Sequence, residues 1–143
     1  MTTATRTVDA TTYSRILDFY ARHVQTLDAG DAKQWAADFT EDGVFGQNVK
    51  PHPKVGRVDI EVGMQKGMDA LAARGISRRH WFGMVTADPV DAHTVRTRYY
   101  ATVFETTPDG EARVYLNTTA EDTLHVTDTS ILVSRRLVTH DNT

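Results

Sequence analysis

The stretch FYARHVQTLDAGDAKQWAADFTEDGVF, residues 19–45, decides the fold. Apolar residues before and within it, at positions 16, 19, 20, 24 and 27, are three or four apart, which is the spacing of one face of an α-helix. Gly30 is expected to end this helix, and Asp31 to cap a second, short helix that buries Trp35. Residues 40–43 predict a turn, and Val44 then begins a strand. The stretch therefore predicts two helices that lead into a sheet.

Asp28 stands out within this stretch because it continues the apolar face that Tyr20 and Val24 form. A carboxylate in the last turn of a helix is disfavoured by the helix dipole, by about 0.3–1 kcal/mol when it is exposed. Stability therefore does not explain Asp28. We expect its carboxylate to point into the interior and to have a functional role.

Length and composition exclude several classes of protein. The 143 residues predict one domain over residues 13–141, preceded by a loose Thr/Ala-rich tail over residues 1–12. A formal net charge of −3 argues against a nucleic-acid-binding protein. The chain has no cysteine, and its six histidines lack the spacing of metal ligands, so we expect neither a metal nor a cofactor. No segment is apolar enough for a signal peptide or a membrane span, which predicts a cytoplasmic protein without a membrane partner.

The middle of the chain predicts a loop and a third helix. Residues 46–55 contain Pro51-His52-Pro53 and are expected to form a flap over a pocket mouth. The apolar positions 60, 64, 68 and 71 then mark an amphipathic helix that ends near Gly75. Gly63 and Gly67 lie inside it, and close packing against the sheet is the expected reason.

From Ser77 onward the apolar period changes to two, which is typical of strands. Three helices followed by an antiparallel meander predict an α+β fold, with the helices packed on one face of the sheet. The inward faces of the strands are expected to carry His80, Phe82, Met84, Tyr99, Glu105, Asp122 and Arg135. The opposite face would carry Trp81, Tyr100, Phe104 and Tyr115. Aromatic side chains on an outer sheet face indicate a partner, so we expect a homodimer through it.

Asp28 and His80 form the first candidate for chemistry. If the helix covers the sheet, both side chains point into the same interior, where a carboxylate can orient an imidazole for general acid–base catalysis. The alternative is a buried histidine that makes one structural hydrogen bond. Both hypotheses remain open at the level of sequence.

Asp122 is the second candidate, because its carboxylate would be desolvated between Ala120 and Leu124. An ion pair with Arg135 on the next strand is the simpler interpretation. For Glu105, at the end of a strand, simple exposure to solvent is the simpler interpretation. Tyr20 and Tyr99 could donate to a substrate oxygen, although buried tyrosines usually only fill a core.

The chain resembles the SnoaL-like branch of the nuclear-transport-factor-2-like superfamily. The resemblance rests on residues 19–45, on RRHWFGM at 78–84, and on EDTLHV at 121–126 with ILVSRRLVTHD at 131–141. It covers Tyr13 to Asp141 and implies a cone-shaped, curved sheet with three N-terminal helices that enclose a deep apolar pocket, usually in a dimer. Many relatives act without a cofactor as cyclases, dehydratases or isomerases in bacterial aromatic polyketide biosynthesis, and the chain looks especially like the actinomycete members.

The resemblance also implies roles for single residues. Scytalone-dehydratase-like members use an aspartate that supports a histidine, and these positions match Asp28 and His80. Those enzymes add a second histidine, whose place falls near Glu105. SnoaL-type cyclases use an aspartate that matches Asp122, whereas the base of ketosteroid isomerases would fall near Gln47.

These observations lead to two hypotheses of different classes. The first is a cofactor-independent lyase or isomerase that acts on a hydrophobic polycyclic substrate of polyketide type. Its catalytic residues would be Asp28, His80 and Asp122, its oxygen-binding residues Tyr20 and Tyr99, and its pocket walls Trp35, Phe82 and Met84. Glu105 and Arg135 would be further substrate-binding residues. The second is a non-catalytic ligand-binding protein or oxygenase partner subunit, because one fold can serve both roles.

Overall fold

The computed structural model describes residues 7–141. Its elements are α1 (Ala10–Asp28), α2 (Ala32–Ala36), β1 (Phe39–Gln47), β2 (Lys54–Val55), α3 (Arg57–Ala73), β3 (Ser77–Pro89), β4 (Thr94–Thr106), β5 (Ala112–Val126) and β6 (Ile131–His140). Of the tail expected over residues 1–12, residues 1–6 lie outside the described residues. Helix α1 already begins at Ala10, because the Asp9 side chain caps it by accepting from the main-chain N–H of Thr12 at 2.7 Å.

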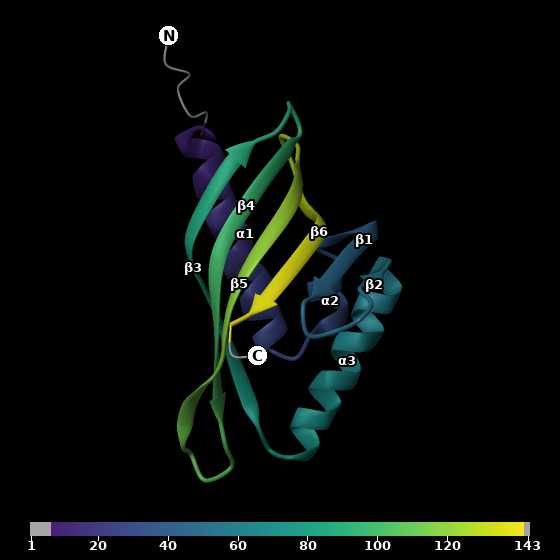
Figure 1. Ribbon diagram of the computed structural model, residues 1–143, viewed down its shortest axis with the longest axis vertical. Coiled ribbons are helices and arrows are strands. Elements are labelled where there is room, and N and C mark those ends of the chain that lie inside the picture. Colours follow the sequence, from purple (N-terminus) through teal and green to yellow (C-terminus); the bar gives the residue numbers. More distant parts are fainter. Residues whose placement is uncertain (1–6, 142–143) are drawn as a thin grey trace.

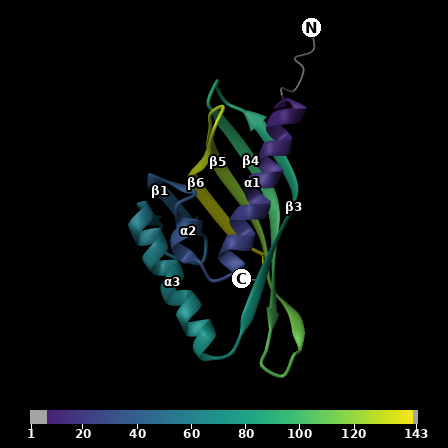
Figure 2. The ribbon, with the colours of Figure 1, turned by 180° about the vertical axis from the view of Figure 1, so that it is seen from behind.

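The six strands form one curved, open sheet in the order β2-β1-β6-β5-β4-β3. All neighbouring strands are antiparallel except β1 and β6, which run parallel. The three helices lie on the same side of the sheet, with α1 crossing β3–β5 and with α2 and α3 beside β1 (Figures 1 and 2). The predicted α+β architecture is therefore confirmed.

Helix α1 positions the site because its inner face packs on the sheet. Ile16, Tyr20, Val24 and Leu27 are buried on that face, as the spacing predicts. Gly30 has a φ of +87° and ends the helix region, and Asp31 then caps α2 by accepting from the main-chain N–H of Gln34 at 3.0 Å.

The turn predicted over residues 40–43 is wrong, because these residues belong to strand β1. Phe39 pairs with Val133 and Val44 with Arg135, and the register shifts between the two pairs. An irregularity of this kind accommodates extra residues without ending the strand. Pairing with β6 therefore overrides the local preference for a turn.

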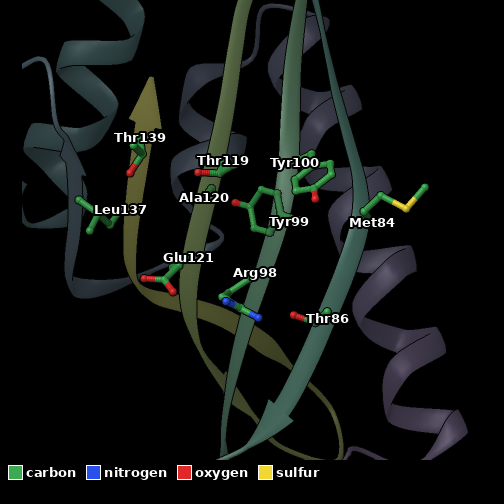
Figure 3. A pocket seen from close by; sticks show the side chains of 10 residues that line it. All are labelled: Met84, Thr86, Arg98, Tyr99, Tyr100, Thr119, Ala120, Glu121, Leu137 and Thr139. Atoms are coloured by element: carbon green, nitrogen blue, oxygen red, sulfur yellow. The ribbon is translucent and has the colours of Figure 1, made fainter. Parts of the chain in front are cut away.

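Met84 does not lie on the inward face, which corrects the expected pocket wall. The register of β3 against β4 shifts between Gly83 and Thr86, and Met84 has a φ of 52°. Such a bulge reverses the alternation of side chains, so Met84 is 78% exposed while Val85 is buried. Figure 3 shows the Met84 side chain beside Tyr100 on the outer face.

Arg135 is also on the outside, and the expected pair with Asp122 is wrong. In the pairing of β5 with β6, Thr123 lies opposite Arg135 but Leu124 lies opposite Val133, so Ser134 is an extra residue. Beyond this bulge the alternation is reversed, and Arg136 instead of Arg135 enters the interior.

The outer face of the sheet carries three of the four predicted aromatic side chains, because Trp81, Tyr100 and Phe104 are exposed there. Tyr115 is the extra residue where the register of β5 against β4 shifts, and the guanidinium of Arg78, which binds the buried Glu105, lies 4.1 Å from the centre of its ring. Its expected place on the outer face is therefore wrong. A hollow of about 340 Å³ lies on this face, and its lining includes Arg98, Glu121 and Leu137 (Figure 3).

Candidate active site

A cavity of about 470 Å³ lies between the helices and the inner face of the sheet. This is a size at which proteins bind small organic ligands. Its apolar lining includes Leu27, Trp35, Phe45, Met64, Met68, Leu71, Phe82, Val103, Leu116 and Val138. Of the flap expected over residues 46–55, Gln47 lines the cavity from strand β1, and no residue from 48 to 55 does. Gly67 does line it, and a Cβ built there would meet nothing within 4 Å, so the expected close packing of this glycine is wrong.

Asp28 and His80 meet at the wall of this cavity. Oδ1 of Asp28 lies 2.8 Å from Nδ1 of His80, and Oδ2 accepts from the main-chain N–H of His80 at 3.2 Å. The two contacts fix both the position of the carboxylate and the rotation of the imidazole. Both side chains remain partly exposed, at 18% for Asp28 and 25% for His80.

This geometry determines which imidazole nitrogen can react. Because the Asp28 carboxylate only accepts hydrogen bonds, the neutral ring of His80 carries its proton on Nδ1. Its Nε2 then has a free lone pair and no hydrogen-bond partner among residues 7–141. The pair can therefore present a base to whatever occupies the cavity.

Asp122 lies behind the cavity wall and is held by Arg136 and two tyrosines. Nε and Nη2 of Arg136 donate to its two oxygens at 2.9 and 3.0 Å. The hydroxyl of Tyr20 donates to Oδ2 at 2.8 Å, and the hydroxyl of Tyr99 is within 3.2 Å of both oxygens. Arg136 and Tyr99 line the cavity, whereas Asp122 and Tyr20 do not.

Burial and charge set the protonation of this cluster. Desolvation, followed by the charge of Asp122, raises the pKa of Tyr20 well above its usual value. Desolvation also raises the pKa of Tyr99. Burial is the largest single effect on Arg136 and opposes its charge, but the charge and hydrogen bonds of Asp122 together with Tyr99 and Tyr20 outweigh burial, so the pKa of the guanidinium is raised. Both phenols thus keep their protons and donate them to Asp122.

His23 is a buried histidine that the sequence analysis did not single out. Its Nε2 accepts from Nη1 of Arg136 at 2.9 Å, and its Nδ1 donates to Oδ2 of Asp38 at 2.8 Å. Desolvation, followed by the charge of Arg136, lowers the pKa of His23 to about 4. A neutral His23 therefore accepts a hydrogen bond from Nη1 of Arg136, the guanidinium nitrogen that does not bind Asp122.

Gln47 and His140 form a second polar group at the cavity. Sequence reasoning missed His140 and named Gln47 only as the position that matches the base of ketosteroid isomerases. Nε2 of His140 lies 2.9 Å from Oε1 of Gln47, and both residues line the cavity. The bulge at Ser134 changes which residues of β6 point inward. Strand periodicity alone therefore gave no signal for Arg136 or His140.

Glu105 does not reach the cavity. It is buried, with only 2% of its surface exposed, so the expected exposure to solvent is wrong. Arg113 and Arg78 donate to its two oxygens, each at 2.9 Å. These bonds, that of Arg113 first, lower the pKa of Glu105 against the opposing effect of burial. Of the expected binding residues, Trp35, Phe82 and Tyr99 line the cavity, while Met84, Glu105 and Arg135 do not.

Among residues 7–141, no group of three or more His, Asp or Glu side chains is arranged to hold a metal ion. None of the helices in this part of the chain is long and apolar enough to cross a membrane.

Comparisons with known proteins place this geometry in context. Residues 8–137 match the model of a family described as a SnoaL-like domain. No curated protein matches the chain. Three solved structures are similar over nearly the whole length of both chains. They are Aln2 from a Streptomyces species, a Catenulispora acidiphila protein in complex with S-DNPA, and ActVI-ORFA from Streptomyces coelicolor.

The similarity to these structures is high in shape and moderate in sequence. Aln2 is 28% identical, with a TM-score of 0.88 and 96% of each chain covered. The Catenulispora protein is 29% identical, with a TM-score of 0.82 and 94% of this chain and 96% of that chain covered. ActVI-ORFA is 27% identical, with a TM-score of 0.84 and 94% of this chain and 100% of that chain covered.

Proposed function

The chain belongs to the SnoaL-like domain family of the nuclear-transport-factor-2-like superfamily, and on this premise we propose that it is a cofactor-independent lyase or isomerase for a polycyclic, polyketide-type ketone or phenol. The observation that carries the proposal is the Asp28–His80 pair, which presents Nε2 of His80 to an apolar cavity of about 470 Å³. The similarity to a protein in complex with the small molecule S-DNPA supports a small-molecule ligand.

In the proposed reaction, Nε2 of His80 removes a proton from a carbon next to a carbonyl group. The electron pair of the broken C–H bond forms an enolate. In a dehydration, the imidazolium then returns the proton to a leaving hydroxyl group, which departs as water. In a ring closure, the enolate carbon attacks a second carbonyl, and the imidazolium protonates the resulting alkoxide. General acid–base catalysis of this type contributes about 10²–10⁴-fold.

Arg136 is the better candidate than Tyr20 or Tyr99 for holding the enolate oxygen. The single proton of each phenol is already donated to Asp122. Arg136 has five N–H groups, of which Asp122 and His23 occupy three, so two remain. Its Cζ lies 5.6 Å from the centre of the Phe82 ring, and Phe82 is two residues from His80 on the same strand face. A fixed cation beside developing negative charge stabilises the transition state.

This assignment gives Asp122 a positioning role. Asp122 accepts hydrogen bonds from Arg136, Tyr20 and Tyr99, so both of its oxygens are occupied, and it does not line the cavity. We therefore propose that Asp122 orients Arg136 and that His80 moves the proton.

Proton exchange tests the proposal without knowledge of the natural substrate. The protein is incubated in D₂O with α-tetralone, and deuterium incorporation next to the carbonyl is followed by NMR. Wild-type protein should accelerate exchange at least about 100-fold over His80→Ala. Equal rates in both proteins, with the ketone shown to bind, would support the non-catalytic binding protein instead.

We also propose that the protein is a homodimer through the outer sheet face. The exposed aromatic side chains of Trp81, Tyr100 and Phe104 form an unpartnered surface there. Sedimentation should show a dimer that Tyr100→Glu converts to a monomer. The control is Val58→Glu, which adds the same charge at an exposed apolar residue of α3 on the helical side. A wild-type monomer would contradict this assignment.

A further inference from the structure

We propose that the Gln47 carboxamide, held by His140 and Asn48, is a second polar subsite of the cavity and binds an acceptor oxygen at the far end of an elongated, multi-ring substrate. The inference rests on the proposed function, because the near end of that substrate is the ketone that His80 deprotonates. Gln47 would then select substrates by their length and by the position of their second oxygen.

The hydrogen bonds of Gln47 leave its donor groups available. Oε1 of Gln47 accepts from Nε2 of His140 at 2.9 Å, and the Gln47 Nε2 group makes no hydrogen bond within residues 7–141. No buried side-chain nitrogen or oxygen in that part of the chain lacks a partner, so this NH₂ group is not buried. Because Gln47 lines the cavity, its two N–H donors are accessible to a ligand there.

The pair is held in place by the neighbouring backbone. Oδ1 of Asn48 accepts from the main-chain N–H of His140 at 2.9 Å, and the main-chain N–H of Asn48 donates to the carbonyl of Val138 at 3.1 Å. These bonds fasten the end of β6 to the end of β1, so His140 fixes the orientation of the Gln47 amide. A donor that is held before the ligand arrives loses little entropy on binding.

The sheet gives the distance between the two polar ends. His80 pairs with Val103, Val103 pairs with Leu116, and His140 pairs with Thr118, so His80 and His140 lie on strands three apart. At about 4.8 Å per strand this corresponds to about 14 Å between the two backbones, measured along the curved sheet. The wall between them is apolar and includes Met64, Met68, Leu116 and Val138. A single ring is too short to reach both groups, whereas several fused rings can span the apolar wall.

The test uses two ligands that differ only at the far end, 2-acetylanthraquinone and 2-ethylanthraquinone. Neither has an enolisable ring carbon next to its ring ketones, so binding is measured apart from chemistry there. Wild-type protein should bind the acetyl compound about fivefold more tightly, as expected for one added hydrogen bond. Gln47→Leu should abolish this preference and leave the affinity for the ethyl compound nearly unchanged.

The matched control is Gln65→Leu, the same change at an exposed glutamine of α3 outside the cavity lining, and it should keep the preference. The side-chain NH₂ signal of Gln47 in wild-type protein gives a second measurement that does not depend on a variant. It should move with the acetyl compound and not with the ethyl compound. An unmoved signal, or a preference that survives in Gln47→Leu, would overturn the inference.

The two proposals fail in different ways. If the acetyl preference is present but wild-type protein exchanges protons no faster than His80→Ala, the subsite stands and the proposed activity is wrong. If proton exchange depends on His80 but no preference is seen, the activity stands and the subsite is wrong.

Discussion

Asp28 accepts two hydrogen bonds from one residue, His80: one from the ring Nδ1 at 2.8 Å and one from the main-chain N–H at 3.2 Å. Asp28 is the last residue of helix α1, and His80 lies near the start of β3. The contact therefore joins the helical layer to the sheet at the wall of the cavity. It also selects the ring tautomer whose Nε2 can act as a base.

Asp28→Asn should impair proton transfer nearly as much as His80→Ala. An asparagine fills the same space, but its NH₂ group would donate to Nδ1 and move the ring proton to Nε2. The protein should stay folded and lose about 10²-fold or more in the rate of ketone exchange. Asp18→Asn, a change at an exposed acid on the same helix, is the control and should keep full activity. Full activity in Asp28→Asn would show that the tautomer is not set by this contact.

The buried pair of Asp122 and Arg136 should be sensitive to loss of either partner. Arg136→Leu leaves a buried carboxylate without its cation, which is expected to lower the free energy of unfolding by about 3–5 kcal/mol. Changing Asp122 to Leu in the same protein should recover part of this loss. Urea unfolding of the two single variants and the double variant measures the coupling.

Arg135→Leu is the matched control for that cycle. Arg135 is the exposed neighbour across the bulge, so its loss should leave the free energy of unfolding nearly unchanged. A larger effect from Arg135 than from Arg136 would mean that β6 lacks the bulge at Ser134.

Stability should depend on pH through His23. Burial lowers the pKa of His23 to about 4, whereas the unfolded chain binds a proton near pH 6.5. Between these values the unfolded state holds more protons, so stability is complete above about pH 6.5 and falls as the pH drops toward 4. At about 1.4 kcal/mol per pKa unit, His23 should contribute a loss of about 3 kcal/mol over this range.

The measurement is urea unfolding between pH 4 and pH 7. His23→Gln should flatten the dependence of stability on pH, although it will also lower stability at pH 7. His52→Gln is the control, because His52 is exposed and should leave the slope unchanged. An unchanged slope in His23→Gln would contradict the assignment.

Gly67 should control the width of the cavity. A Cβ at Gly67 meets nothing within 4 Å, so Gly67→Ala should raise the free energy of unfolding by up to about 1 kcal/mol through helix propensity. Gly67→Leu should occupy cavity volume and weaken binding of 2-ethylanthraquinone with the fold intact. Gly63→Ala is the comparison, because its Cβ would meet the end of the Lys54 side chain at 3.1 Å. Unchanged ligand affinity in Gly67→Leu would place the ligand elsewhere.

The sequence predicted the long helices α1 and α3, the strands from β3 to β6 and the approach of Asp28 to His80, because regular periodicity sets each of them. Asp28 is one helical turn beyond Val24, and His80 lies on β3 before any irregularity. Up to the first bulge of a strand, counting by twos correctly assigns each side chain to a face of the sheet.

Residues beyond a bulge were assigned to the wrong face. Met84 follows the point where the register of β3 changes, and Arg135 follows the extra residue of β6. The cost and position of a bulge depend on the neighbouring strand, which local periodicity does not contain. Because of the same reversal in β6, period-two counting did not place Arg136 and His140 on the inner face, although both line the cavity.

The ¹⁵N spectrum of the His80 ring tests the central claim most directly, because it reports which nitrogen carries the proton and which one meets the ligand. For the neutral ring, the account predicts a protonated Nδ1 and an unprotonated Nε2. It further predicts that Asp28→Asn reverses the two and that a polycyclic ketone shifts the Nε2 signal. A ring protonated on Nε2 in wild-type protein, or an Nε2 signal that ignores a bound ketone, would contradict the account.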